Sequence, residues 1–358
     1  MKMITKILNW FFFRKKRDYS LLQAVEAKRG GRPVSVHYMT KPLQYMNMKA
    51  IPLDPDYCNV LIVTNHFIDA EKFTAFLQKS DTAWDVITLL PHEDNALAST
   101  LLLPEVVEFW TPADYGVKFN FFLKELHQRH CKIKMIEEGI GNYVRSDMGF
   151  AHWHPFLARH RWLSKLTFEL AREIAHFLSG SGSGLNLSKW TDELHLYYPQ
   201  YPAIPCRERS VLRQLPLTPT ENFQQLDKFF DFSEYEWIAE LQNKKILIMP
   251  TDWSGEAKFD QNDLSGYDVL IVKYHPHLKD RSSRCEAQIA YMAGNLPTEI
   301  LIFRLLNQHC QVTLRGKFTS SLVYLLDTPV KLEFEDGDIP DFMRDYFKFV
   351  TDEGIKNV

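Results

Sequence analysis

The chain has 358 residues, of which 45% are hydrophobic and 24% are charged, and its formal net charge is −3. This composition is that of a folded protein long enough for two domains, and it excludes a disordered or fibrous chain. The nearly neutral total argues against binding of nucleic acid by the whole molecule, although a local basic surface is compatible with it.

Cysteine spacing and hydropathy exclude two further classes of protein. The five cysteines are odd in number, widely spaced and never arranged as C-x-x-C. We therefore expect neither a disulfide framework nor a zinc site, and we expect a reducing compartment. No run of eighteen apolar residues occurs, so the sequence predicts no segment that spans a bilayer.

Residues 1–20, MKMITKILNWFFFRKKRDYS, mix aromatic and aliphatic side chains with a basic cluster. The apolar part is too short for the core of a signal peptide, and no small-residue cleavage site follows it. Aromatic residues beside basic ones suit a helix that lies in the interface of an anionic membrane. A helix packed on the body of the protein is the alternative interpretation.

From residue 59 the pattern alternates between strands and helices. The segments 59–67, 84–91 and 131–138 have the apolar runs of buried strands, and 69–80 and 113–130 have helical spacing. This alternation predicts βαβ units and a parallel sheet, within a first domain of residues 21–242.

The same alternation of predicted strands and helices begins again in a second domain, residues 243–358. Apolar cores occur at 244–252, 267–277, 299–310 and 330–334. Between the two sets, residues 149–242 show no strand rhythm, and we expect helices and the crossing into the second domain there. The run SGSGSG at 179–184 has the composition of a flexible linker, engineered or natural.

The stretch KMIEEGIGNY places Glu137 and Glu138 where an apolar strand ends, directly before Gly139. In open parallel sheets, ligands bind beyond the carboxyl ends of the strands. Two neighbouring carboxylates repel each other, so we expect a raised pKa for at least one of them if they are partly desolvated. A raised pKa suits a general base near neutral pH, whereas a solvated acidic turn is the alternative interpretation.

A second strand end, VLIVKYHPH, carries positive charge. His275 can donate to an anion when protonated, and Pro276 fixes the backbone directly after it. Lys273 lies two residues earlier and is expected on the same side of the extended segment. A purely structural histidine is the alternative.

A third candidate is GKFTSSLVYLL, where Thr319 and Ser320 are good N-caps for an apolar helix. With Ser321, they would stand beside the free N–H groups of a first helical turn, which bind anions. Plain capping without a ligand is the alternative.

These three stretches carry a family resemblance. IEEG, YHP and TSS match, in order and in strand-end context, the D/E-D/E-G motif, the HP motif and the serine pair of bacterial sialyltransferases. KMIEEGIGNY, LIVKYHPH, FTSSLVYLL and the first strand and helix resemble the capsule-building bacterial polysialyltransferases more closely. The resemblance runs from about residue 59 to residue 327 and is sharp in the motifs. It departs at KYHP, where a KPHP-like form is usual, and around SGSGSG, where acceptor contacts are expected.

The resemblance implies a GT-B fold, with two Rossmann-like parallel-sheet domains facing a central cleft and CMP-sialic acid held mainly by the second. Glu137 would be the general base for the acceptor hydroxyl, with Glu138 and Gly139 supporting the turn and leaving room for the sugar. His275 would be the general acid or charge stabiliser for the departing CMP phosphate. The implied donor-binding residues are Lys273, Pro276, Glu299, Thr319, Ser320 and Ser321.

An oxocarbenium-like transition state with a good anionic leaving group can be stabilised by fixed donors in place of a metal. We therefore predict metal-independent, inverting direct displacement, with no cofactor besides the donor substrate. A polyanionic product predicts a basic groove, for which a solvated helical face is the alternative. The predicted acceptor contacts are Arg145, His154, Arg159, His160, Arg161 and Lys165, and further basic residues near them are Arg172, Arg207, Arg209 and Arg213.

The sequence thus predicts a polysialyltransferase of capsule synthesis, which adds sialic acid in α2,8 or α2,9 linkage to the nonreducing end of a sialylated chain. Its expected place is the cytoplasmic face of the inner membrane, peripherally bound and near the capsule synthesis and export machinery, without nucleic acid. The alternatives are a mono-sialyltransferase of lipooligosaccharide and a catalytically silent glycan-binding or capsule-assembly protein.

Overall fold

The computed structural model describes residues 17–67, 69–114, 116–139, 142–143, 180, 188–204, 208–216, 220–230, 232–251, 259, 264–275, 278, 283–286, 288–293, 296–316, 328–334, 344–346 and 348–350. Its contacts divide the chain into two compact units, Met1–Pro216 and Leu217–Val358. Among the residues in these ranges, no helix is both long and apolar enough to cross a membrane.

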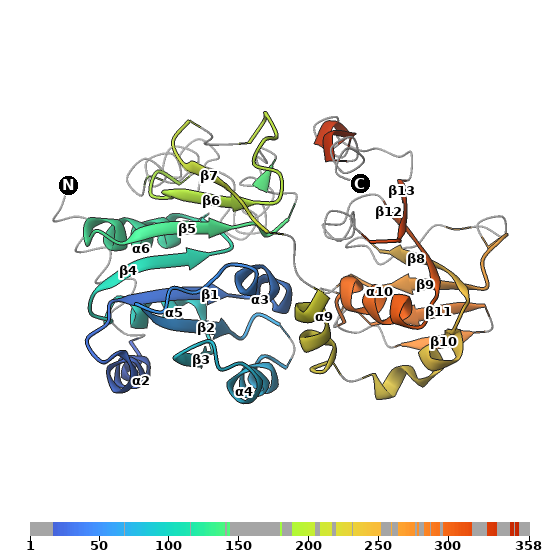
Figure 1. Ribbon diagram of the computed structural model, residues 1–358, viewed down its shortest axis with the longest axis horizontal. Helices are drawn as coiled ribbons and strands as arrows, with labels where there is room; N and C mark the ends of the chain where they lie inside the picture. Colours follow the sequence, from blue (N-terminus) through green and yellow to red (C-terminus); the bar gives the residue numbers. More distant parts are fainter. Residues whose placement is uncertain are drawn as a thin grey trace, which may run out of the picture. The chain divides into compact units, whose positions relative to one another are not determined.

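The first unit is built on a seven-stranded sheet in the order β3-β2-β1-β4-β5-β6-β7, in which every neighbouring pair is parallel (Figure 1). The strands are β1 Val34–Met39, β2 Cys58–Thr64, β3 Val86–Leu90, β4 Val106–Thr111, β5 Lys132–Ile136, β6 Glu193–Leu196 and β7 Val211–Gln214. The helices are α2 Tyr19–Arg29, α3 Pro42–Lys49, α4 Ala70–Ser80, α5 Glu93–Thr100 and α6 Val117–Gln128. The strands and helices predicted between residues 59 and 138 are confirmed, with ends shifted by a few residues.

One core of this unit lies where α2, α5 and α6 pack against the sheet. Leu21 of α2, Leu97 of α5 and Phe122 of α6 join Val34 and Val36 of β1 in a single buried cluster. Helix α2 begins at an N-cap aspartate whose side chain accepts a hydrogen bond from Ser20 N at 2.8 Å, and it ends at a left-handed glycine.

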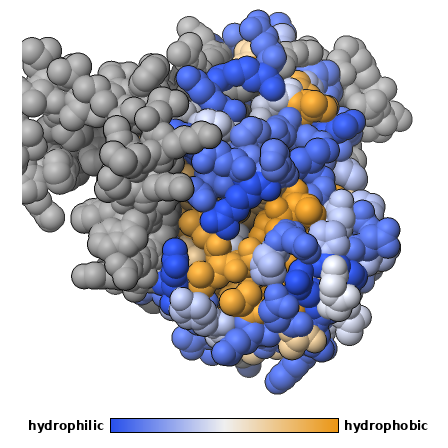
Figure 2. Space-filling model, turned by 90° about the vertical axis from the view of Figure 1, so that its left-hand side faces the viewer, coloured by the Kyte–Doolittle hydropathy of each residue, from blue (hydrophilic) through white to orange (hydrophobic). Residues whose placement is uncertain are grey.

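On the side of the unit where the strands begin, Figure 2 shows a group of hydrophobic residues ringed by hydrophilic ones. That surface is at the opposite end of the strands from the residues that follow β5.

Strand β1 was not predicted: its sequence VSVHYM alternates apolar and polar residues and lacks the continuous apolar run that marks a strand buried on both faces. It is nevertheless an interior strand, between β2 and β4, and is buried along its whole length. His37 lies with its ring stacked on Trp110 at a centroid distance of 5.4 Å and edge-on to Trp84 at 4.7 Å. Burial lowers the pKa of His37 to about 3, so the imidazole is neutral at physiological pH. A neutral aromatic ring packs here as an apolar side chain would.

The expectation that residues 149–242 lack strands is wrong for two segments, β6 and β7. Both are four residues long, and both pair in parallel next to β5. Their charged side chains, such as Glu193 and Arg213, interrupt the apolar pattern. Within the predicted stretch, residues 149–179, 181–187, 205–207, 217–219 and 231 lie outside the described ranges.

The second unit contains a six-stranded sheet in the order β10-β11-β9-β8-β12-β13, parallel except for the pair β10 and β11. Its strands are β8 Lys245–Pro250, β9 Val269–Lys273, β10 Arg284–Glu286, β11 Ile289–Met292, β12 Gln311–Gly316 and β13 Lys331–Phe334. Its helices are α9 Thr220–Asp227, the 3-10 helix η3 Ser233–Leu241 and α10 Thr298–Asn307.

The division between the units falls before α9 rather than at residue 242, where the sequence places it. The physical reason is that α9 packs on α10. Arg304 makes two bonds of 3.0 Å to the carboxylate of Asp227, and Phe223 stacks on Phe303 at 5.8 Å. The predicted fold class, two Rossmann-like α/β domains with parallel sheets, is confirmed for both units. The central cleft that the GT-B class implies stays a prediction.

Candidate active site at the carboxyl end of β5

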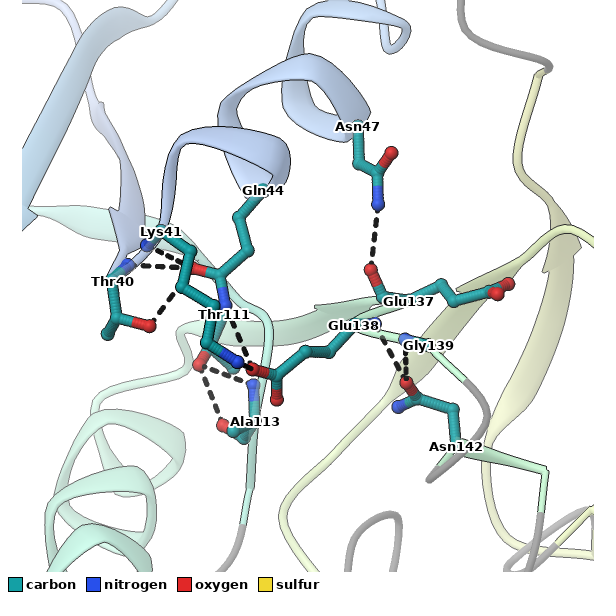
Figure 3. A network of polar contacts seen from close by, with 10 residues as sticks. All are labelled: Thr40, Lys41, Gln44, Asn47, Thr111, Ala113, Glu137, Glu138, Gly139 and Asn142. Carbon is teal, nitrogen blue, oxygen red and sulfur yellow. Dashed lines mark hydrogen bonds and ion pairs between the residues drawn. The ribbon is translucent and has the colours of Figure 1, made fainter. Parts of the chain in front are cut away.

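Polar side chains gather where strands β1, β4, β5 and β6 end. Because these strands are parallel, their carboxyl ends lie at the same edge of the sheet, which is where ligands bind in this class of fold. Figure 3 shows residues after β1 and after β5 joined by hydrogen bonds, with Thr111 and Ala113 at the end of β4 bonded to each other. Thr111 closes the turn after β4 through a bond of 2.7 Å from its hydroxyl to the carbonyl of Ala113.

Glu137 is the first residue after β5, and its side chain is 0% exposed. Its backbone N–H donates to His195 O at 2.9 Å, and its carbonyl accepts from Asn47 Nδ2 at 2.9 Å. Its Oε2 atom accepts from the backbone N–H of Tyr197 at 2.7 Å and from the hydroxyl of Tyr143. Its Oε1 atom is buried and has no hydrogen-bond partner among the residues that the structure describes. One oxygen of the carboxyl is thus fixed by two donors, while the other has none among the described residues.

Burial raises the pKa of Glu137 from 4.5 to about 8, and the two donors on Oε2 act in the opposite direction. The predicted raised pKa is therefore found, but its cause differs from the expected one. Repulsion between the two glutamates was the expected cause, whereas desolvation by burial raises the pKa of Glu137 in the structure. A carboxyl with this pKa is partly ionised near neutral pH and meets the titration requirement for a general base.

Glu138 has a different environment, because successive side chains of an extended segment point to opposite sides. Figure 3 shows its carboxylate directed toward the start of α3, away from the side chain of Glu137. Lys41 Nζ lies 2.6 Å from its Oε1 atom, and Gln44 Nε2 donates to the same oxygen at 3.2 Å. The side-chain oxygen Oε1 of Gln44 in turn accepts from Thr40 N at 2.6 Å. Glu138 is therefore a paired carboxylate that ties β5 to α3.

The turn after the two glutamates is closed by Asn142. Its Oδ1 atom accepts from Glu138 N at 2.7 Å and from Gly139 N at 3.1 Å, and its own N–H donates to Gly139 O at 3.0 Å. Gly139 has a φ of 144°, which side-chain-bearing residues rarely adopt. The predicted supporting role of Gly139 in this turn therefore has a backbone reason.

The enclosure of Glu137 has a direct consequence for chemistry. A substrate hydroxyl reaches Oε1 only after atoms that surround it in this structure have moved aside, since the side chain has no exposed surface. The same enclosure is what raises the pKa. Burial thus gives Glu137 both its raised proton affinity and its protection from water.

In the second unit, Lys273 closes β9 and is 2% exposed. Its ammonium donates to the carbonyl of Ala293 at 2.7 Å and to that of Tyr274 at 3.1 Å. Burial lowers its pKa to about 7, and the charge of Glu299 opposes this shift. Glu299 itself is 3% exposed in the first turn of α10. The described contacts of Lys273 are thus with the protein backbone, so it holds the ends of β9 and β11 together rather than presenting an open positive charge.

His275 follows β9 by two residues and is partly exposed. Its backbone N–H donates to the hydroxyl of Thr251 at 3.0 Å, which joins the ends of β8 and β9. The structure therefore places His275 at a strand end, as predicted, two residues after the buried Lys273. Several predicted residues lie outside the described ranges: Pro276, Thr319, Ser320, Ser321, Arg145, His154, Arg159, His160, Arg161 and Lys165.

No family model matches the chain, and no curated protein matches it. Three solved structures are similar to it over most of its length. The first is the wall teichoic acid polymerase TagF with CDPG, with a TM-score of 0.45, 11% identity, and coverage of 97% of this chain and 82% of that one. The second is the glycotransferase of kitacinnamycin, with a TM-score of 0.41, 10% identity, and coverage of 89% and 91%. The third is LpCGTa in complex with UDP, with a TM-score of 0.39, 8% identity, and coverage of 90% and 94%.

Sequence reasoning missed the residues that surround Glu137. Asn47 and Tyr197 lie 90 and 60 residues away along the chain, and only the sheet topology brings them to β5. Tyr143, by contrast, belongs to the KMIEEGIGNY stretch itself. A tyrosine six residues after a strand-end glutamate is a signal that could have been used.

Proposed function

We propose that this chain is a glycosyltransferase that moves sialic acid from CMP-sialic acid to the nonreducing end of an oligosialic or polysialic acid chain, in the synthesis of a capsular polysaccharide. The observation that carries the proposal is the state of Glu137: a strand-end carboxyl with a pKa of about 8, one oxygen held by two donors and the other unpartnered among described residues. The resemblance of IEEG, YHP and TSS to sialyltransferase motifs supplies the choice of donor.

In the proposed reaction, ionised Glu137 takes the proton of the acceptor hydroxyl as that oxygen attacks the anomeric carbon of the donor. The bond between the anomeric carbon and the phosphate oxygen breaks, and CMP leaves with the electron pair. Attack from the face opposite CMP inverts the anomeric configuration. His275, with Ser320 and Ser321, would stabilise the phosphate charge, so the displacement proceeds without a metal. Glu138 has no proton-transfer role in this scheme, because Lys41 and Gln44 hold its carboxylate.

The test is incubation of the purified chain with CMP-sialic acid and a labelled short oligosialic acceptor, followed by analysis of product length. We expect lengthened products, resistance to a metal chelator, and loss of at least about a hundredfold in kcat for Glu137→Gln and His275→Ala. Glu138→Gln is the matched control for charge removal at the neighbouring position and should lose far less. Full activity of Glu137→Gln, or no lengthening at any salt concentration, would refute the proposal.

The enclosure of Glu137 favours one alternative of a different class. A carboxyl with no exposed surface that accepts one donor from the turn after β5 and one from the segment after β6 also suits a purely structural role. In that case the chain would bind sialylated glycans without transferring sugar. Acceptor binding by calorimetry together with absent transfer and absent hydrolysis of CMP-sialic acid would favour this binder. Addition of a single residue would instead favour a mono-sialyltransferase of lipooligosaccharide.

A further inference from the structure

We infer that Oε1 is the atom of Glu137 that exchanges the proton, and that Tyr143 is the positioning residue that reserves Oε1 for this role by occupying Oε2. The inference rests on the proposed function, because it concerns the atom-level use of the same carboxyl. It assigns Tyr143 a part that neither the motif resemblance nor the strand-end argument contains.

The first step is the arrangement of donors around Oε2. The backbone N–H of Tyr197 points to this oxygen at 2.7 Å, and the hydroxyl of Tyr143 forms a short hydrogen bond with it. The direction of the second bond follows from the hydroxyl oxygen of Tyr143, which accepts from the backbone N–H of Tyr198 at 3.0 Å. With that N–H on the oxygen, the hydroxyl proton is directed to Oε2.

The second step is the location of the proton on the neutral carboxyl. An oxygen that accepts two donors has no room for a proton of its own in the same directions, so the neutral acid carries its proton on Oε1. Oε1 has no partner among the described residues, and the atom is buried. Loss of that proton creates a carboxylate with an open lone pair at Oε1, while Oε2 keeps its two donors. The acceptor hydroxyl therefore donates to Oε1.

The third step concerns charge. A donor on Oε2 stabilises the ionised form more than the neutral form, and a bond to a charged group contributes more than one to a neutral group. Tyr143 accordingly lowers the pKa of Glu137 against the dominant effect of burial. Without the hydroxyl, the carboxyl would hold its proton to higher pH and would be free to carry it on either oxygen.

The variant that tests this is Tyr143→Phe, which keeps the buried ring and removes the hydroxyl. We expect the acid limb of the kcat/KM profile to move up by about one pH unit, so that activity falls about tenfold at pH 7 and recovers near pH 10. A second readout needs no activity: the infrared band of the neutral carboxyl, identified by its absence from Glu137→Gln, should titrate with a midpoint raised by the same amount. Tyr57→Phe, in the same unit but before β2, is the matched control and should change neither quantity.

The outcomes separate this inference from the proposed function. A loss of activity in Tyr143→Phe that is equal at all pH values, with an unmoved infrared midpoint, overturns the inference while the proposed function stands. Full activity of Glu137→Gln overturns both. If Tyr143→Phe folds poorly, Tyr143→Trp, which keeps a ring with a donor but displaces it, should also raise the midpoint, and an unmoved midpoint there would again overturn the inference.

Discussion

The stability of the protein should depend on pH through Glu137, and the variant Glu137→Gln isolates this dependence. The amide has nearly the shape of the carboxyl but cannot ionise. Its oxygen can take the place of Oε2 beside Tyr143 and Tyr197, which leaves the NH2 group at the Oε1 position without a partner among the described residues. Among the described residues the neutral acid leaves one O–H donor unpaired there, whereas the amide leaves two N–H donors. One additional unsatisfied buried donor costs about 1–3 kcal/mol, and this cost is the same at all pH values.

The pH-dependent part follows from the pKa shift. The folded protein holds the Glu137 proton up to about pH 8, whereas the unfolded chain loses it at about 4.5. Between these values the folded state binds more protons, so the contribution of Glu137 is fully present below pH 4.5 and is lost as the pH rises. At ~1.4 kcal/mol for each pH unit, the loss reaches about 5 kcal/mol at pH 8. Glu137→Gln has no such loss.

The two unfolding curves should therefore cross. At about pH 5 the variant should be less stable than the wild type, and at about pH 8.5 it should be more stable by roughly 2–4 kcal/mol. Urea unfolding of both proteins at a series of pH values measures the difference, in which the contributions of all shared groups cancel. Curves that stay parallel from pH 4.5 to pH 8 would refute the assignment of a raised pKa to Glu137.

Three further predictions concern other parts of the chain. Lys273→Met should remove a pH dependence of stability that is opposite in sign to that of Glu137. The unfolded chain keeps the lysine proton up to about pH 10.5 and the folded protein only up to about 7, so the free energy of unfolding of the wild type should rise relative to that of the variant as the pH increases from 7 to 10.5. A difference between the two proteins that does not change with pH would contradict the burial of the charge. Lys41→Ala should lower the unfolding free energy by at most about 1 kcal/mol in urea titrations, because the side chain of Lys41 is 61% exposed. A loss of about 3 kcal/mol would show that the ion pair with Glu138 stabilises the fold more than an exposed pair does. Binding of sialic acid oligomers should weaken with salt more steeply as the oligomer lengthens, measured by titration calorimetry, and equal slopes for short and long oligomers would remove the predicted basic groove.

Much of the fold could be predicted from the sequence where strands are buried on both faces. Segments 59–67 and 267–277 have continuous apolar runs bounded by turn residues, and the structure places β2 and β9 there. Strand β1 was not predicted because its burial depends on two tryptophan rings that pack against His37 and place this polar residue in the core. Strands β6 and β7 were not predicted because they are short and carry charged side chains near the edge of the sheet.

The candidate site was predictable in position but not in environment. The rule that ligands bind at strand ends located Glu137 and His275 from the order of apolar runs alone. Burial, which decides the pKa of Glu137 and of Lys273, depends on which distant segments cover a residue, and no local pattern contains that information. For the same reason the sequence treated Lys273 as an open cation, whereas its ammonium is bound to main-chain carbonyls.

The Glu137 side chain also continues the hydrogen bonding between β5 and β6 past the ends of the two strands. Beyond the last register pair, Ile136 with His195, the N–H of Tyr197 donates to Oε2 of Glu137, whose own main-chain carbonyl accepts from Asn47 instead. The side chain thus completes the ladder between β5 and β6. The amide resonance of Tyr197 consequently serves as a built-in indicator: its proton shift should follow the ionisation of Glu137, so a single labelled backbone position can report the state of the base during turnover.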